Sequence, residues 1–141
     1  MNDTEYLQFI HEAARMGIQG LEDVKDHVST GGMQAAIAGQ LGEYREISAA
    51  AGSLLRSRGE KPKEPGLMAR LSSGIMSTAK TMADSSPSAI AEMIIQGNNM
   101  GIVKSIKHLH DYDGDSRPVR ALADKLLKTE EANVEQMKPF L

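Results

Sequence analysis

Residues 33–58 read MQAAIAGQLGEYREISAAAGSLLRSR, and apolar side chains recur in this stretch every three or four residues. The recurring positions are Met33, Ile37, Leu41, Tyr44, Ile47, Ala51 and Leu54 or Leu55. This spacing places them on one face of an α-helix, the face that packs into a core. Gly59 and the proline-containing run over residues 60–66 predict the end of the helix and a loop after it.

The same helical period appears in four further segments, and no segment shows a convincing strand pattern. The predicted helices span about residues 3–28, 67–83, 87–110 and 117–138. A chain of 141 residues is of ordinary size for one domain and can bury a core of its own. The sequence therefore predicts a single all-α domain over residues 1–141.

Residues that favour helix ends separate these segments. Asp3 or Thr4 is expected to cap the first helix, and Gly31-Gly32 to stop it. Ser86 stands directly before a proline, the usual order of an N-cap followed by the first helical residue. These boundaries leave short turns between consecutive helices, except for the long connection around residues 59–86.

The composition narrows the classes of function. The chain has 16 Lys and Arg against 19 Asp and Glu, and aromatic residues make up only 4% of it. It therefore lacks the basic, aromatic-lined surface of a nucleic-acid-binding protein. Zero cysteines exclude disulfides, thiol catalysis and thiolate metal sites. With no signal peptide pattern and no run of about 18 apolar residues, we expect a cytoplasmic protein without a membrane partner.

Polar residues interrupt each of the four long helical stripes near its middle. The interruptions are Gln19; Glu43 with Glu46; Asn98 beside Asn99; and Glu130 with Asn133. A polar group that points into a helix bundle is costly unless it bonds to another group, to water or to a metal. These residues are therefore the candidate functional site.

Four short segments around these residues resemble the ligand-bearing segments of ferritin-like four-helix bundles, in particular those of uncharacterised bacterial ferritin-like families. The segments are Ile18-Gln19-Gly20-Leu21-Glu22, Gly42-Glu43-Tyr44-Arg45-Glu46, Gly97-Asn98 and Glu130-Glu131-Ala132-Asn133. The resemblance implies a ferritin-like up-down bundle with one long crossover, in which the short helix predicted over residues 67–83 would lie.

The resemblance also implies where a di-metal site would be. Ferritin-like di-iron sites take one Glu from each of two helices and a Glu-x-x-His pair from each of the other two. Gln19 and Asn98 stand where that family has the single glutamates, while Glu46 and Asn133 stand where it has histidines. Only Glu43 and Glu130 keep the expected residue. Because an amide is a weak, uncharged ligand, the resemblance implies an incomplete di-iron site.

Three interpretations of these six positions remain open. The amides Gln19, Asn98 and Asn133 can bond to one another or to a buried water in a neutral network, with no cofactor. A slip of helix register would instead place the polar residues beside the core, facing solvent. In the third interpretation, Glu43, Glu46 and Glu130 bind residual metal such as iron or manganese.

No other pattern in the chain predicts chemistry. The run Asp111-Tyr112-Asp113-Gly114-Asp115 lacks the glycine and the final glutamate that a calcium loop requires at fixed places. The four histidines form no i, i+4 metal pair, and nothing associates them with a serine nucleophile. The sequence therefore does not decide whether the protein is an enzyme, although the lack of a catalytic pattern favours a protein without catalytic activity.

The helix predicted over residues 87–110 is apolar over a broad arc. Its predicted inner stripe consists of Ala91, Ile95, Asn98, Ile102, Ile106 and Leu109. Met93 and Met100 fall off this stripe, as does Met76 on the short helix. A helix that is apolar beyond one face has more than one packing partner, here the crossover helix or a second subunit.

Six glycines add a further expectation, because each costs about 1 kcal/mol against alanine inside a helix. They are Gly17, Gly20, Gly39, Gly42, Gly97 and Gly101. They predict close helix approach or room for bulky neighbours. The alternative is neutral sequence drift in a fold that is stable enough to tolerate the cost.

The first hypothesis for function is a non-catalytic ferritin-like bundle that acts through self-association, as a dimer, or through a protein partner. The alternative is a carboxylate-bridged metal-binding or oxidoreductase bundle with an unusual ligand set.

Overall fold

The computed structural model describes residues 1–64 and 84–141 of the chain. Within them lie four long helices, α1 (Asp3–Lys25), α2 (Gly31–Ser57), α5 (Pro87–Asp111) and α6 (Arg117–Met137). A short 3-10 helix, η1 (Lys138–Phe140), follows α6, and this part of the chain contains no strand. The all-α prediction is confirmed for these residues. The helix predicted over residues 67–83, with Met76, lies outside the described residues.

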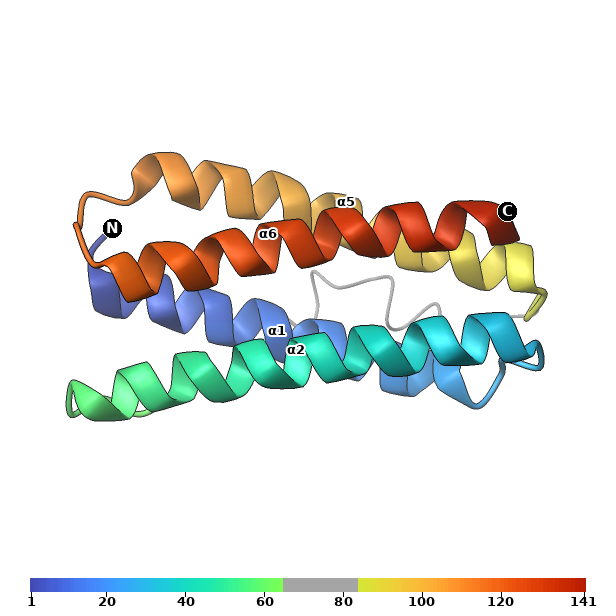
Figure 1. Cartoon of the computed structure of the whole chain (residues 1–141), viewed down its shortest axis with the longest axis horizontal. Coiled ribbons are helices and arrows are strands. Elements are labelled where there is room, and N and C mark those ends of the chain that lie inside the picture. The colour runs from blue at the N-terminus through green and yellow to red at the C-terminus, as the bar shows by residue number, and fades with distance from the viewer. Residues whose placement is uncertain (65–83) are drawn as a thin grey trace.

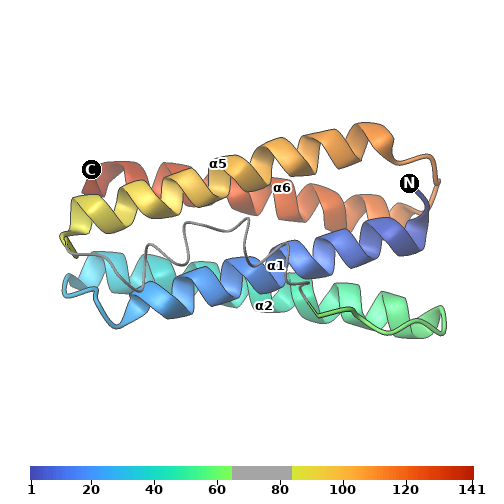
Figure 2. The ribbon, with the colours of Figure 1, turned by 180° about the vertical axis from the view of Figure 1, so that it is seen from behind.

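The four helices form two antiparallel pairs, α1 with α2 and α5 with α6 (Figure 1). The view from behind in Figure 2 shows the same two layers, with α1 and α5 on the near side. The direction of the chain colouring shows that α2 and α5 run the same way. α2 therefore ends at the opposite end of the bundle from the one where α5 begins.

The helix starts follow from side-chain caps. Asn2, rather than Asp3 or Thr4, caps α1, because its side chain accepts from the backbone N–H of Glu5 while the Glu5 carboxylate accepts from that of Asn2. Ser86 caps α5 as predicted, with its hydroxyl accepting from the N–H of Ala89. The prediction from turn chemistry is therefore right for α5 and one or two residues late for α1.

The end of α1 differs from the prediction. The helix stops at Lys25 instead of residue 28, and Gly31 and Gly32 are the first residues of α2 rather than the stop of α1. Val28 is buried although it lies in the turn between the two helices. Its apolar side chain continues the helical period into the turn, which explains why the predicted helix is too long.

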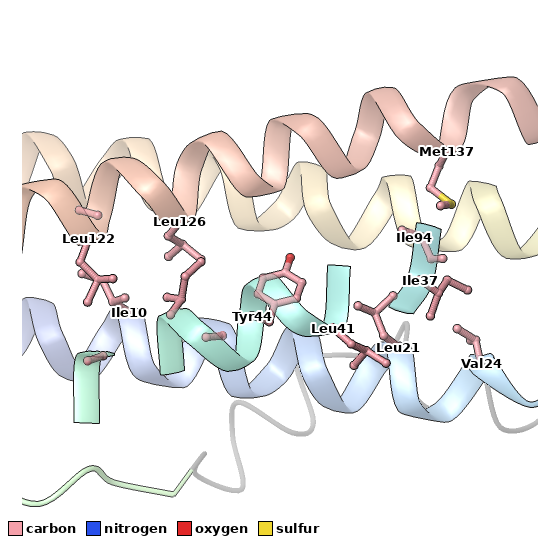
Figure 3. Packing of buried hydrophobic residues seen from close by; sticks show 14 of the residues in the cluster. Ile10, Leu21, Val24, Ile37, Leu41, Tyr44, Ile94, Leu122, Leu126 and Met137 are labelled. Carbon is pink, nitrogen blue, oxygen red and sulfur yellow. The ribbon is translucent and has the colours of Figure 1, made fainter. Parts of the chain in front are cut away.

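The core lies between the two helix pairs (Figure 3). The predicted α2 stripe is confirmed, with Leu55 as its last member, since the buried residues are Met33, Ile37, Leu41, Tyr44, Ile47, Ala51 and Leu55. Each fully buried aliphatic side chain contributes about 1.5–3 kcal/mol relative to an exposed one. This apolar contact is the main force that holds the two pairs together.

The predicted inner stripe of α5 is wrong in its second half, and Met93, which was predicted to lie off the stripe, is buried. Ile106 and Leu109 are more than a third exposed, at 39% and 38%, and Ser105 is buried instead. The reason is a bulky neighbour on α6: the Glu130 side chain lies against α5, where only small residues such as Gly101 and Ser105 leave space for it.

In the part of the chain that is described, no helix combines the length and apolar character needed to cross a bilayer.

Candidate functional site

Three polar side chains from three helices meet in the middle of the bundle. The Tyr44 hydroxyl of α2 donates to Asn98 Oδ1 of α5 at 2.9 Å. Asn133 of α6 donates through Nδ2 to Asn98 Oδ1 at 3.1 Å and to the Tyr44 hydroxyl at 3.3 Å. Figure 3 shows the Tyr44 ring rising from α2 with its hydroxyl directed toward the opposite helix pair. We call Tyr44, Asn98 and Asn133 the polar triangle.

The polar triangle is neutral. Burial raises the pKa of the Tyr44 hydroxyl, the nearby charge of Glu130 raises it further, and the bond from Asn133 opposes both effects. Tyr44 therefore keeps its proton and acts as a donor at any physiological pH. Asn98 Nδ2 donates to the backbone carbonyl of Ile94 at 2.9 Å. A network of satisfied neutral groups fixes helix register without the cost of a buried charge.

Gly17 of α1 provides the space for the Tyr44 ring. A Cβ atom at this position would lie 2.6 Å from Cε2 and from Cζ of Tyr44, well inside van der Waals contact. The glycine thus lets the ring lie against the α1 backbone. The polar triangle therefore depends on all four long helices, although α1 contributes no polar side chain to it.

Glu130 lies within the bundle, on the same helix as Asn133 and three residues before it. It is 4% exposed, and its Oε1 accepts a hydrogen bond from the Ser105 hydroxyl at 2.7 Å. Burial raises the pKa of this carboxyl to about 7, partly offset by the Ser105 bond. A Cβ at residue 101 would overlap its Oε2, so Gly101 makes room for the carboxylate as Gly17 does for Tyr44.

The other predicted ligand positions lie outside the core. Glu43 and Glu46 of α2 are exposed and face Lys125 of α6, whose Nζ is 3.9 Å and 2.8 Å from their respective Oε2 atoms. Such exposed ion pairs contribute at most about 1 kcal/mol. These two carboxylates therefore belong to the surface between α2 and α6 and not to the site around Glu130.

Gln19 is exposed, so the prediction that it interrupts the inner stripe of α1 is wrong. The buried face of α1 is formed by Tyr6, Leu7, Ile10, Ala14, Leu21 and Val24. Gly17 continues this face, and the Tyr44 ring lies against it.

The structure thus separates five of the six positions into two groups, and Glu130, buried beside Ser105, belongs to neither. Asn98 and Asn133 join in a neutral network, as the first interpretation expected, whereas Gln19, Glu43 and Glu46 face solvent, as the second expected. Across residues 1–64 and 84–141, no three His, Cys, Asp or Glu side chains gather in a way that could hold a metal ion.

Several buried polar residues were not identified from the sequence. The Tyr44 hydroxyl and Ser105 are two of them, and Gln40 is a third, 1% exposed and donating to Gln136 Oε1 at 3.1 Å. For Ser105 a signal was present, because it lies seven residues, close to two helical turns, after Asn98. For the Tyr44 hydroxyl no signal was present in the sequence, since an aromatic residue in an apolar helical period is ordinarily an apolar core residue.

Comparisons with protein-family models, with curated proteins and with solved structures give no match to this chain.

Proposed function

We propose that this protein is a non-catalytic, ferritin-like helical bundle that lacks a complete di-iron site and acts by self-association through α5. The parallel direction of α2 and α5 supports the ferritin-like part of the proposal, because a single long crossover produces that order. The neutral polar triangle supports the absence of a di-iron centre, since uncharged groups occupy the middle of the bundle.

The observation that carries the self-association is the exposed apolar surface of α5. Five large hydrophobic side chains are exposed in the described residues, and four of them lie on this helix: Met100, Val103, Ile106 and Leu109. Met100 is 44% and Val103 53% exposed. Met100, Val103 and Ile106 share one side of α5, whereas Leu109 lies about 180° around the helix from Met100. Single exposed apolar residues are ordinary, whereas a group on one side of a helix marks an interaction surface.

The residues around this surface favour a second copy of the chain as the partner. The outward face of α5 consists of Glu92, Gln96, Asn99, Met100, Val103, Ile106 and Lys107, all exposed. If two copies of α5 pair antiparallel about a two-fold axis between residues 99 and 100, Glu92 of each copy lies opposite Lys107 of the other. Met100 and Val103 then lie near the axis, opposite Asn99 and Gln96 of the other copy. A two-fold contact repeats every favourable pair twice.

A charge exchange tests this pairing. Glu92→Lys and Lys107→Glu alone each place like charges opposite one another twice, so we expect either to weaken dimerisation at least about tenfold. The double variant restores opposite charges and should restore the dimer. The measurement is sedimentation equilibrium of the wild type and the three variants at low salt, because screening weakens exposed pairs.

The matched control is Glu135→Lys on α6, which makes the same charge change as Glu92→Lys at a side chain that is 70% exposed. It should leave the dimer unchanged. A wild type that stays monomeric at high concentration would contradict the proposal, and so would a double variant that associates no better than either single one.

The alternative function, a carboxylate-bridged metal-binding bundle, would require Glu43, Glu46 and Glu130 to converge. Glu130 is buried beside Ser105, while the two α2 carboxylates are exposed beside Lys125, so the geometry favours the first proposal.

A further inference from the structure

A cleft of about 740 Å³ lies between α1, the second half of α2 and the loop that follows α2. His11 and Arg15 line it from α1, four residues apart and therefore on one helix face. Ser48 and Arg56 line it from α2, eight residues apart and again on one face. Residues 59–62 and Glu64 close its third side. A volume of this size suits a small molecule.

The loop that forms the third side is held by specific contacts. Gln8 of α1 bonds to it twice, donating through Nε2 to the Lys61 carbonyl at 2.8 Å and accepting at Oε1 from the Lys63 N–H at 2.9 Å. The loop also lies close to α2, because Pro62 Cγ is 3.5 Å from the place that a Cβ of residue 52 would take, which is ordinary van der Waals contact. The wall of the cleft is therefore fixed to both helices.

The cations in the cleft are available for a ligand. No ion pair within 4.0 Å joins Arg15 or Arg56 to a carboxylate of residues 1–64 or 84–141, although Glu60 and Glu64 also line the cleft. The buried Nδ1 of His11 has no hydrogen-bond partner. Burial lowers the pKa of His11; Arg15 and Arg56 lower it further, and Glu64 opposes them. The positive charges of Arg15 and Arg56 are therefore both close enough to the His11 ring to affect its pKa.

We propose that this cleft binds a compact phosphate group carried by a small molecule, with Arg15 and Arg56 as the charged donors and the Ser48 hydroxyl as a neutral one. Guanidinium groups match phosphate oxygens in geometry, and two of them flanking one group add to its retention. The cleft is lined by α1, α2 and the loop, so this site is separate from the outward face of α5 and does not depend on the proposed self-association.

The test uses the full chain and inorganic phosphate as the probe, at constant ionic strength balanced with chloride. NMR of the His11 ring and of the backbone amides of residues 59–64 should show saturable shifts as phosphate is added. Arg15→Gln and Arg56→Gln each remove a charged donor, so each should weaken binding at least about tenfold. Glu64→Gln removes a repelling carboxylate and should tighten binding severalfold.

Lys128→Gln serves as the control, since it makes the same charge change on α6 at a side chain that is 74% exposed. It should leave the phosphate affinity unchanged. Both arginines are exposed, so their variants should keep the thermal midpoint of the wild type. Shifts that rise linearly without saturation, or that are equal in the arginine variants and the control, would overturn the proposal.

Discussion

Glu130→Gln should raise the free energy of unfolding by about 3 kcal/mol at pH 8, because it removes a carboxylate that is charged and buried. Burial raises the pKa of this carboxyl from 4.5 to about 7, and each pKa unit corresponds to about 1.4 kcal/mol. Glutamine keeps nearly the same shape and can still bond to the Ser105 hydroxyl, which donates and accepts. The variant thus reproduces the protonated glutamic acid at every pH.

The sign of the effect sets the pH window. The folded protein holds the proton of Glu130 more tightly than the unfolded chain, so between pH 4.5 and about 7 it binds more protons and this group's contribution to stability falls as pH rises. Below that window both states are protonated and the cost of ionisation is absent. Above it both states are ionised and the cost is complete.

Urea unfolding at pH 4.5, 6 and 8 measures this difference. The gap between Glu130→Gln and the wild type should be small at pH 4.5 and largest at pH 8. Glu131→Gln is the matched control, because it removes the neighbouring but exposed carboxylate and should change stability by less than about 0.5 kcal/mol. Parallel pH profiles for Glu130→Gln and the wild type would show that the buried carboxyl pays no ionisation cost.

The sequence predicted the part of this fold that a helical period determines. Buried apolar residues on α2, the cap at Ser86 and the convergence of Asn98 with Asn133 all follow from spacing and residue type. The rotation of each helix about its axis does not follow as directly. Each residue turns the direction by about 100°, so Gln19 lies about 160° around α1 from Gly17 and is exposed while Gly17 faces Tyr44.

Neighbouring side chains decided the positions that the sequence misassigned. The α5 stripe was expected to continue to Ile106 and Leu109. Instead, Glu130 lies against this half of the helix, where Gly101 leaves room for its carboxylate and Ser105 is buried. The spacing of apolar residues on α5 cannot predict a contact with a carboxylate on another helix. The long-range contact, and not local propensity, therefore sets which face of α5 is buried.

The helical glycines show the same limit. In the sequence Gly17, Gly39, Gly42 and Gly101 are equivalent, each an apparent cost inside a helix. In the structure a Cβ at Gly17 or Gly101 would collide with a buried side chain, whereas one at Gly39 or Gly42 would have nothing within 4 Å. The prediction of room for bulky neighbours is right for the first pair, and drift remains the simpler explanation for the second.

Gly17→Ala should therefore lower the free energy of unfolding by about 2 kcal/mol, even though alanine improves helix propensity by about 1 kcal/mol. The new methyl group would lie 2.6 Å from the Tyr44 ring, which is buried and held at its hydroxyl by Asn98 and Asn133. The ring cannot turn aside without breaking the polar triangle. Gly42→Ala, on an exposed helix surface, is the matched control and should stabilise by up to about 1 kcal/mol.

Two variants of Tyr44 distinguish the effect of its ring on the Gly17→Ala penalty from the effect of its hydroxyl. Tyr44→Phe keeps the ring, so Gly17→Ala should still destabilise in that background, although by less because the ring is no longer held. Tyr44→Leu removes the ring, so the alanine should become neutral or stabilising there. Denaturant unfolding of these pairs gives the coupling energy between the two positions. A Gly17→Ala penalty that is unchanged in the leucine background would mean that α1 is constrained by something other than the contact with Tyr44.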